Sequence, residues 1–166
     1  MIGLKDARSA LSRNTGVVIP VYFPRGGDHA SAEALLADTV EGLRREVRSP
    51  GAICLSADGP GTGEETARRL ARKHRLALEC SPRNRGKLAA LRSGMLRLLT
   101  NPRLRYLATV DQDANHFPNE LVNFVRSAGG PAAIVPWGSS AASSKSSPTV
   151  FSWTRLPITR RSPGSP

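Results

Sequence analysis

The chain has 166 residues, enough for one domain with a hydrophobic core, and its 39% hydrophobic and 22% charged residues are ordinary for a globular protein. No apolar stretch approaches the roughly 20 residues of a membrane-spanning helix, and the N-terminus lacks the apolar run of a secretory signal. We therefore expect a soluble, cytoplasmic protein. Cys54 and Cys80 are the only cysteines, and each lies in an apolar, strand-like segment. We interpret both as reduced core thiols rather than as a disulfide or zinc ligands.

The formal net charge of +11 raises the question of a nucleic-acid partner. Residues 1–128 hold 20 Lys and Arg against 13 Asp and Glu, and residues 129–166 add four bases and no acid. The bases of residues 1–128 alternate with acids on predicted helices, which is typical of solvated helix faces. This distribution argues against nucleic acid, although the excess of Arg would suit an anionic substrate or an acidic membrane surface.

The first half of the chain predicts a strand, a helix and a second strand. Residues 17–22 form a mostly β-branched run before a Pro- and Gly-rich loop, as in a strand buried on both faces. Apolar residues recur at helical spacing from 32 to 47, and Pro50-Gly51 ends that helix. Residues 52–57 form a second apolar run, which the turn Asp-Gly-Pro-Gly at 58–61 closes.

The second half repeats this alternation. A capping box at 62–65 (Thr-Gly-Glu-Glu) opens a helix that runs to about Arg75, and a short third strand follows at 76–80. A fourth strand at 106–110 leads to a helix that begins near Pro118 and closes at Gly129-Gly130. Between these strands a helix at 86–99 carries an apolar stripe, formed by Leu88, Leu91, Met95, Leu98 and Leu99.

Strands that alternate with helices at this spacing predict right-handed βαβ units and an α/β, Rossmann-like fold, with helices flanking a mostly parallel sheet. Ligands of such sheets bind beyond the carboxyl ends of the strands. The polar residues of interest all follow strands, so four loops converge on one edge: they are Tyr22, Asp58, the segment 81–87, Asp111 and Asp113.

Asp111 and Asp113 stand two residues apart at the end of the fourth predicted strand. Side chains at i and i+2 of an extended segment point to the same side. Both carboxylates can therefore face one divalent cation, or one can face the cation and the other a sugar hydroxyl. Mg²⁺ is usually held by one or two carboxylates together with substrate phosphates, so the pair suits a metal–diphosphate site. Asp-rich turns after strands are also common without any such role.

The segment 81–94 (Ser-Pro-Arg-Asn-Arg-Gly-Lys-Leu-Ala-Ala-Leu-Arg-Ser-Gly) has anion-binding character of its own. Gly86 at a helix start lets backbone N–H groups approach an anion, and the helix N-terminus adds positive potential. Arg83, Arg85 and Lys87 cluster beside it. The alternative is a basic turn that only leads into a core helix.

These motifs together resemble the family 2 glycosyltransferases of the GT-A type. The resemblance covers about residues 15–128, and its parts are Val-Ile-Pro-Val-Tyr at 18–22, Asp58-Gly59, Asn-x-Gly-Lys-x-x-Ala-x-x-x-Gly at 84–94, and Asp111-x-Asp113. It implies a nucleotide-diphosphate sugar as donor and Mg²⁺ or Mn²⁺ as cofactor.

By position, the resemblance implies that Pro20 and Tyr22 border the nucleotide base and that Asp58 hydrogen-bonds the base edge. It also implies roles for the later motifs: Arg85, Gly86 and Lys87 lie near the ribose or diphosphate, Asp111 reaches the ribose or metal, and Asp113 binds the metal.

The C-terminal part departs from the family pattern. The family keeps a general base, usually an Asp, and its acceptor site in the C-terminal half, but no Asp or Glu follows Glu120 here. The acceptor and the base therefore remain unknown. The resemblance implies a glycosyltransferase that transfers the donor's sugar to this acceptor, and the alternative is a fragment truncated after the Asp-x-Asp region that is inactive by itself. Residues 132–135 could form a fifth strand, whereas residues 139–166 hold nine Ser and four Pro and no acid. A shifted reading frame would also produce such an end.

We thus expect an N-terminal extension at 1–14, a partial nucleotide-sugar-binding domain at 15–136, and a disordered Ser/Pro/Arg-rich tail at 137–166. Two other functions remain open. One is a nucleotidyltransferase-like enzyme that uses the same loop and carboxylates on a nucleoside triphosphate. The other is a non-enzymatic basic protein that binds nucleic acid or anionic surfaces through dispersed Arg.

Overall fold

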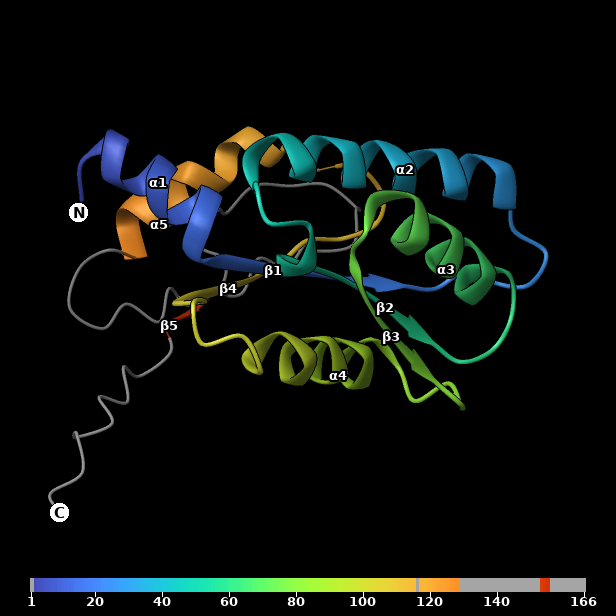
Figure 1. Cartoon of the computed structure of the whole chain (residues 1–166). Helices are drawn as coiled ribbons and strands as arrows, with labels where there is room; N and C mark the ends of the chain where they lie inside the picture. Colours follow the sequence, from blue (N-terminus) through green and yellow to red (C-terminus); the bar gives the residue numbers. More distant parts are fainter. Residues whose placement is uncertain (1, 116, 129–152, 156–166) are drawn as a thin grey trace, which may run out of the picture.

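The computed structural model describes residues 2–115, 117–128 and 153–155. Over these residues the chain has an α/β fold, in which helices flank both faces of a mostly parallel sheet (Figure 1). The predicted alternation of strands and helices is confirmed in its order. The fold is consistent with the Rossmann-like class expected from the sequence.

The sheet has the strand order β3-β2-β1-β4-β5, with β1 (Thr15–Val21) at its centre. The strands β2 (Ile53–Asp58), β3 (Ala77–Ser81) and β4 (Tyr106–Thr109) run parallel to their neighbours. β1, β2 and β4 are buried at every residue, as predicted for strands covered on both faces, whereas the edge strand β3 is only half-buried.

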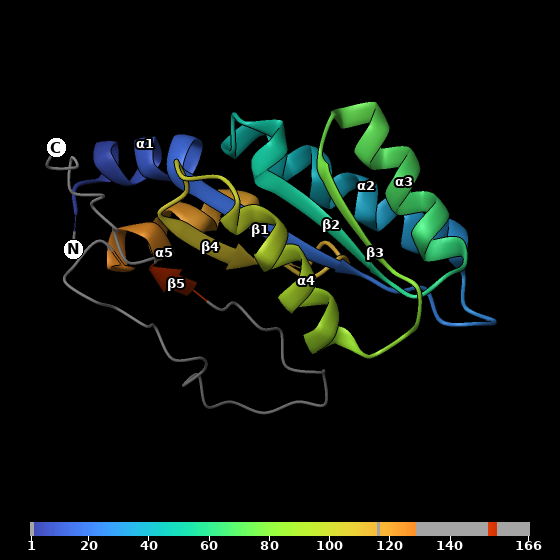
Figure 2. The ribbon, with the colours of Figure 1, turned by 60° about the horizontal axis from the view of Figure 1, so that its bottom comes forward.

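Helices cover the two faces of the sheet unequally. Figures 1 and 2 show α4 alone on one face and the other helices on the opposite face. The helices are α1 (Leu4–Asn14), α2 (His29–Glu46), α3 (Thr62–His74), α4 (Lys87–Leu99) and α5 (Leu121–Ala128), and the short 3-10 turns are η1 (Pro50–Ala52) and η2 (Pro118–Glu120).

The isolated position of α4 follows from the strand order. The chain moves outward from β1 to β2 and β3, with α2 and α3 as the crossovers, and then returns past β1 to β4 through α4. Crossovers between parallel strands are almost always right-handed. A crossover that runs in the reverse direction must therefore cover the opposite face of the sheet.

Two motif residues of α4 serve this packing. The Ser56 hydroxyl on β2 donates a hydrogen bond of 2.7 Å to the carbonyl oxygen of Ala90. Gly94 lies against the sheet so closely that a Cβ there would stand 2.5 Å from Cγ1 of Val18 and 3.3 Å from Cβ of Ser56. The final Gly of the Asn-x-Gly-Lys-x-x-Ala-x-x-x-Gly motif thus has a structural reason, since a residue without a Cβ lets α4 approach β1 and β2.

The N-terminal extension at 1–14 contains a helix that the sequence analysis did not predict. α1 buries Ala7 and Leu11 in the core and packs against α5, and the backbone N–H of Ile2 donates to the carbonyl oxygen of Arg126 at 3.1 Å. Only a few apolar residues mark its buried side, so its periodicity is weak. Tertiary packing against α5, rather than a strong local pattern, accounts for this helix.

Two details of the predicted helices are wrong. The capping box fails by one residue, because α3 already begins at Thr62 and its N-cap is Gly61, which offers no side chain. The apolar stripe predicted for α4 is also too long, because its first and last residues are not buried: Leu88 is 82% and Leu99 42% exposed. Leu91 and Leu98 are buried as expected, and Met95 packs against the core from a partly buried position.

Part of the predicted tail takes part in the sheet. Residues 153–155 form β5, which pairs antiparallel with β4 at the edge, within a segment predicted to be disordered. Three residues are too few for a periodic signal, so only pairing with β4 reveals the strand. The strand predicted at 132–135, the helix stop at Gly129-Gly130 and the rest of the tail lie outside the described residues.

Both cysteines are free thiols in or beside the core, as the sequence analysis expected. Cys54 is buried and Cys80 half-buried. Burial raises the pKa of Cys54 to about 12, so that group stays protonated. Among the described residues, no helix combines the length and the apolar character that crossing a membrane demands.

The close approach of α4 to the sheet makes Gly94→Ala a test of the fold. The added methyl group must displace Val18, and overpacking of this kind costs about 1–3 kcal/mol of unfolding free energy. Denaturant unfolding followed by circular dichroism measures the loss. Gly51→Ala is the matched control, because a Cβ there meets nothing within 4 Å. Equal stability of the two variants would contradict the described packing.

Candidate functional site

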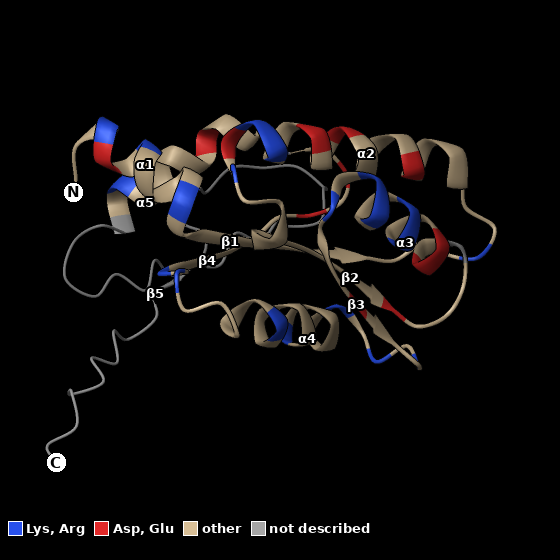
Figure 3. Cartoon of the chain, viewed as in Figure 1, with Lys and Arg blue, Asp and Glu red and all other residues tan. Residues whose placement is uncertain are grey.

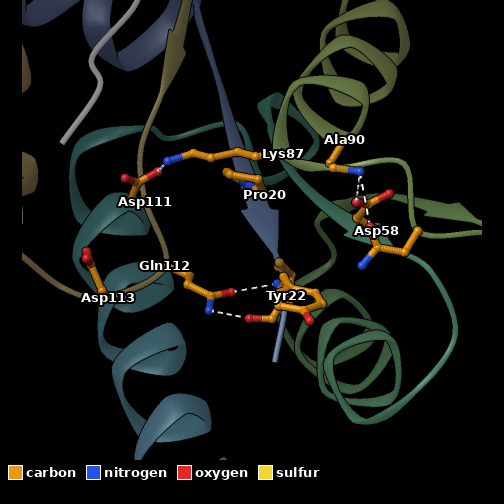
Figure 4. Close-up of a pocket in the computed structure, with 11 residues that line it drawn as sticks. Pro20, Tyr22, Asp58, Lys87, Ala90, Asp111, Gln112 and Asp113 are labelled. Carbon is orange, nitrogen blue, oxygen red and sulfur yellow. Dashed lines mark hydrogen bonds and ion pairs between the residues drawn. The ribbon is translucent and has the colours of Figure 1, made fainter. Parts of the chain in front are cut away.

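A cavity of about 510 Å³ lies beyond the carboxyl ends of β1, β2 and β4. It sits where the strand order reverses, between the outward run through β2 and the return to β4, which is the position where open α/β sheets bind ligands. Its lining consists of Pro20, Val21, Tyr22, Asp58, Asn84, Gly86, Lys87, Ala90, Asp111, Gln112 and Asp113 (Figure 4).

Asp58 holds the basic loop in place against the end of β2. One carboxylate oxygen accepts the backbone N–H of Arg85 at 2.9 Å and the other accepts the N–H of Gly86 at 2.6 Å. Gly59 adds to this contact, because its φ of +96° suits glycine and a Cβ would stand 2.9 Å from the backbone nitrogen of Asn84. The Asp-Gly turn and the basic loop therefore form one structural unit.

The same contacts orient the N-terminus of α4 toward the cavity. Gly86 is the N-cap, with φ of 90°, and as a glycine it has no side chain to cap the helix, so the Asp58 carboxylate that accepts its N–H is the negative group beside this helix end. The first turn holds no acidic residue, and the first helical residue is Lys87. A cation beside the positive end of a helix dipole is an unfavourable arrangement, and an anion bound there would compensate both charges.

Lys87 reaches across the cavity to the opposite wall. Its Nζ atom lies 2.6 Å from a carboxylate oxygen of Asp111, and the two side chains are 47% and 17% exposed (Figure 4). Lys87 begins α4, whereas Asp111 follows β4, so the ion pair connects two separate elements. The ammonium group neutralises a largely shielded carboxylate.

Asp111 and Asp113 lie on the same side of the cavity, but the predicted extended geometry is wrong (Figure 4). β4 ends at Thr109, and Gln112 and Asp113 are in a turn. The Asp113 carboxylate accepts hydrogen bonds from Asn115, from its side-chain amide at 2.7 Å and its backbone N–H at 3.3 Å. The turn, rather than strand alternation, accounts for this arrangement.

The donor set fits Mg²⁺ or Mn²⁺ only as a partial site. Two carboxylates beside a cavity match the way Mg²⁺ is held when substrate phosphates complete its shell. Within the described residues no group of three or more His, Cys, Asp or Glu side chains is positioned to hold a metal ion. His116, which follows the Asp pair in the sequence, lies outside the described residues. Any cation here would need oxygen ligands from a bound substrate.

Gln112 connects the two loops that border the cavity. Its side-chain oxygen accepts the backbone N–H of Tyr22 at 2.9 Å, and its side-chain nitrogen donates to the Tyr22 carbonyl oxygen at 2.7 Å (Figure 4). This two-point contact continues the β1–β4 pairing beyond the strand ends by means of a side chain. It fixes the Asp-x-Asp turn relative to Tyr22, whose side chain is 52% exposed.

The structure brings most of the predicted site residues together. Seven of the eight residues predicted for the site line the cavity. Arg85 does not line it, but its backbone N–H donates a hydrogen bond to Asp58, which does. The predicted bond of Asp58 to a nucleotide base stays a prediction, and both its oxygens already accept loop N–H groups. The sequence analysis missed Gln112 as a site residue, although its place between the two aspartates could have marked it.

Comparisons with known proteins add no identification. No protein-family model and no curated protein sequence matches the chain. The function must therefore be inferred from the residues and the geometry of the cavity.

The Asp58 contacts predict that this residue stabilises the fold locally. Asp58→Ala removes the acceptor of the Arg85 N–H and leaves the Gly86 N–H with its longer contact of 3.1 Å to Oδ1 of Asn84, and we expect a loss of about 1.5–3 kcal/mol in unfolding free energy. Denaturant unfolding measures it, with the exposed Asp38→Ala on α2 as control, which should change stability by less than about 0.5 kcal/mol. A loss no larger than that of the control would contradict the anchoring role.

The Gln112 contact predicts a specific change in backbone protection. In Gln112→Ala the Tyr22 N–H loses its acceptor, so its hydrogen exchange should accelerate by about tenfold, as expected for one hydrogen bond. Gln112→Glu retains an acceptor and should show a smaller change. Hydrogen exchange by NMR measures both, and the amide of Ile19 within β1 is the internal control. Unchanged exchange at Tyr22 would show that the contact does not form in solution.

Proposed function

We propose that the chain binds a nucleotide-diphosphate sugar in the cavity at the switch point, as the donor-binding part of a glycosyltransferase similar to family 2. The observation that carries the proposal is the convergence of four separate sequence motifs on one cavity. The β1 end, the Asp58 turn, the basic loop and the Asp-x-Asp turn lie far apart in the sequence; Tyr22 and Gln112, for example, are separated by 90 residues.

The chemistry of the lining supports a diphosphate in particular. The uncapped N-terminus of α4 and the Lys87 ammonium both favour anionic oxygen atoms on one wall. Asp111 and Asp113 on the other side offer carboxylates to a divalent cation. A diphosphate with Mg²⁺ or Mn²⁺ would satisfy both sides. When bound, the cation would neutralise the charge that develops on a departing diphosphate.

The pairing of the carboxylates supports donor binding more than transfer. Inverting transfer needs a base that takes the proton of the acceptor hydroxyl. Each carboxylate of the described cavity already has a partner: backbone N–H groups for Asp58, Lys87 for Asp111 and Asn115 for Asp113. We therefore propose that these carboxylates serve donor binding rather than proton transfer.

The charge distribution makes a general polyanion-binding surface the weaker alternative. The coloured ribbon of Figure 3 shows acidic residues interspersed with basic ones along α1, α2 and α3. Several of the bases are paired, as Arg68 is with Glu64 at 2.5 Å and Arg69 is with Glu33. The cavity, in contrast, combines cationic and carboxylate groups in the way that a metal–phosphate ligand requires.

Calorimetric titration with UDP- and GDP-sugars, with and without Mn²⁺, tests the proposal. We expect saturable binding that requires Mn²⁺ and that weakens by about 10–100-fold in Asp113→Ala, the change expected for one lost charged contact. The same exposed control, Asp38→Ala, should bind like the parent chain.

Three results would contradict the proposal. Preference for a nucleoside triphosphate would favour a nucleotidyltransferase. Salt-sensitive binding to any polyanion, unaffected by Asp113→Ala, would favour a non-enzymatic basic protein. Absence of binding to every nucleotide would exclude a donor site in this chain.

A further inference from the structure

We propose that Lys87 is a replaceable counter-ion of Asp111, so that a divalent cation and a nucleoside diphosphate enter the cavity together rather than independently. This inference rests on the function proposed above and adds that the binding of the cation and the binding of the diphosphate are coupled. Without ligands, the ammonium group of Lys87 stands 2.6 Å from the Asp111 carboxylate (Figure 4). It thereby provides the positive charge that a divalent cation would bring.

The ammonium group and a cation compete for the same carboxylate. Asp111 is only 17% exposed, so solvent screens its surroundings poorly, and two positive groups beside it would repel each other strongly. A cation that enters alone must first displace Lys87. The wall of the cavity where Lys87 stands offers no other acidic partner within α4, because the first turn of this helix holds no Asp or Glu.

A diphosphate changes this balance. Its oxygen atoms can accept the Lys87 ammonium and the N–H groups at the uncapped start of α4, so the displaced cationic side chain gains a new partner. Asp111 then becomes available to the cation, which also contacts the phosphates. The two ligands therefore increase each other's affinity, and this coupling must be equal in both directions.

The position of Lys87 favours exchange over a permanent structural role. Its side chain is 47% exposed, so it can move without opening the core. A cation at the start of a helix opposes the helix dipole, which weakens the pairing of Lys87 with Asp111. The pair therefore stabilises the ligand-free cavity weakly and leaves Lys87 free to exchange partners.

Mn²⁺ and UDP titrated separately and together into the parent chain and into Lys87→Met test this inference. Mn²⁺ binding is followed by water-proton relaxation. In the parent chain we expect weak Mn²⁺ binding alone and clearly tighter binding with UDP present. In Lys87→Met we expect Mn²⁺ alone to bind at least about fivefold tighter, the low end of typical coupling, and the gain from UDP to shrink by a similar factor.

Lys73→Met on the exposed side of α3 is the matched control for removing one positive charge far from the cavity. Equal Mn²⁺ affinity in Lys87→Met and Lys73→Met, with UDP binding intact in the parent chain, would overturn the exchange and leave the proposed function standing. Absence of UDP binding to the parent chain, with and without Mn²⁺, would instead overturn the proposed function and the transfer of Lys87 to phosphate with it.

Discussion

The right-handedness of βαβ crossovers is the constraint from which this structure follows. It places α2 and α3 on one face of the sheet and, because the chain reverses direction after β3, places α4 on the other. The reversal leaves the carboxyl ends of β1 and β4 side by side without a crossover above them. The cavity occupies that position, and its walls come from the elements on each side of the reversal. Local sequence had no part in choosing this place.

A second feature of the cavity is that the charges of its carboxylates are compensated by other groups of the protein. Three carboxylates line it, and each is already neutralised or hydrogen-bonded within the described chain. Asp58 is itself buried, and its contacts hold the backbone of a loop, so they belong to the architecture. The Lys87–Asp111 pair joins an exposed, flexible side chain to a shielded carboxylate, so it is the contact that a ligand can exchange. The paired carboxylate at one wall, Asp58, thus stabilises the fold, whereas the paired carboxylate at the other, Asp111, has a proposed role in ligand binding.

Individual elements and residues show which features of the structure could be predicted from the sequence. Largely apolar runs identified β1 and β2, because strands buried on both faces have no polar alternation. The helix α1 was missed, since two buried residues are too few for a periodic signal. Tyr22, Asp58, Lys87 and the Asp pair were expected at one sheet edge, and the described cavity brings them together. Gln112 was overlooked because its partner is the backbone of Tyr22, a contact that carries no sequence signal.

The sequence by itself determined the alternation of elements and the fact that the polar loops follow the strands, because periodicity and turn chemistry are local properties. Tertiary structure alone decided the strand order, the approach of Gly94 to Val18, the anchoring of the basic loop by Asp58 and the pairing of Lys87 with Asp111. Each of these depends on atoms that lie far apart along the chain. Only the packing of helices on the sheet sets those distances, and no local pattern encodes them.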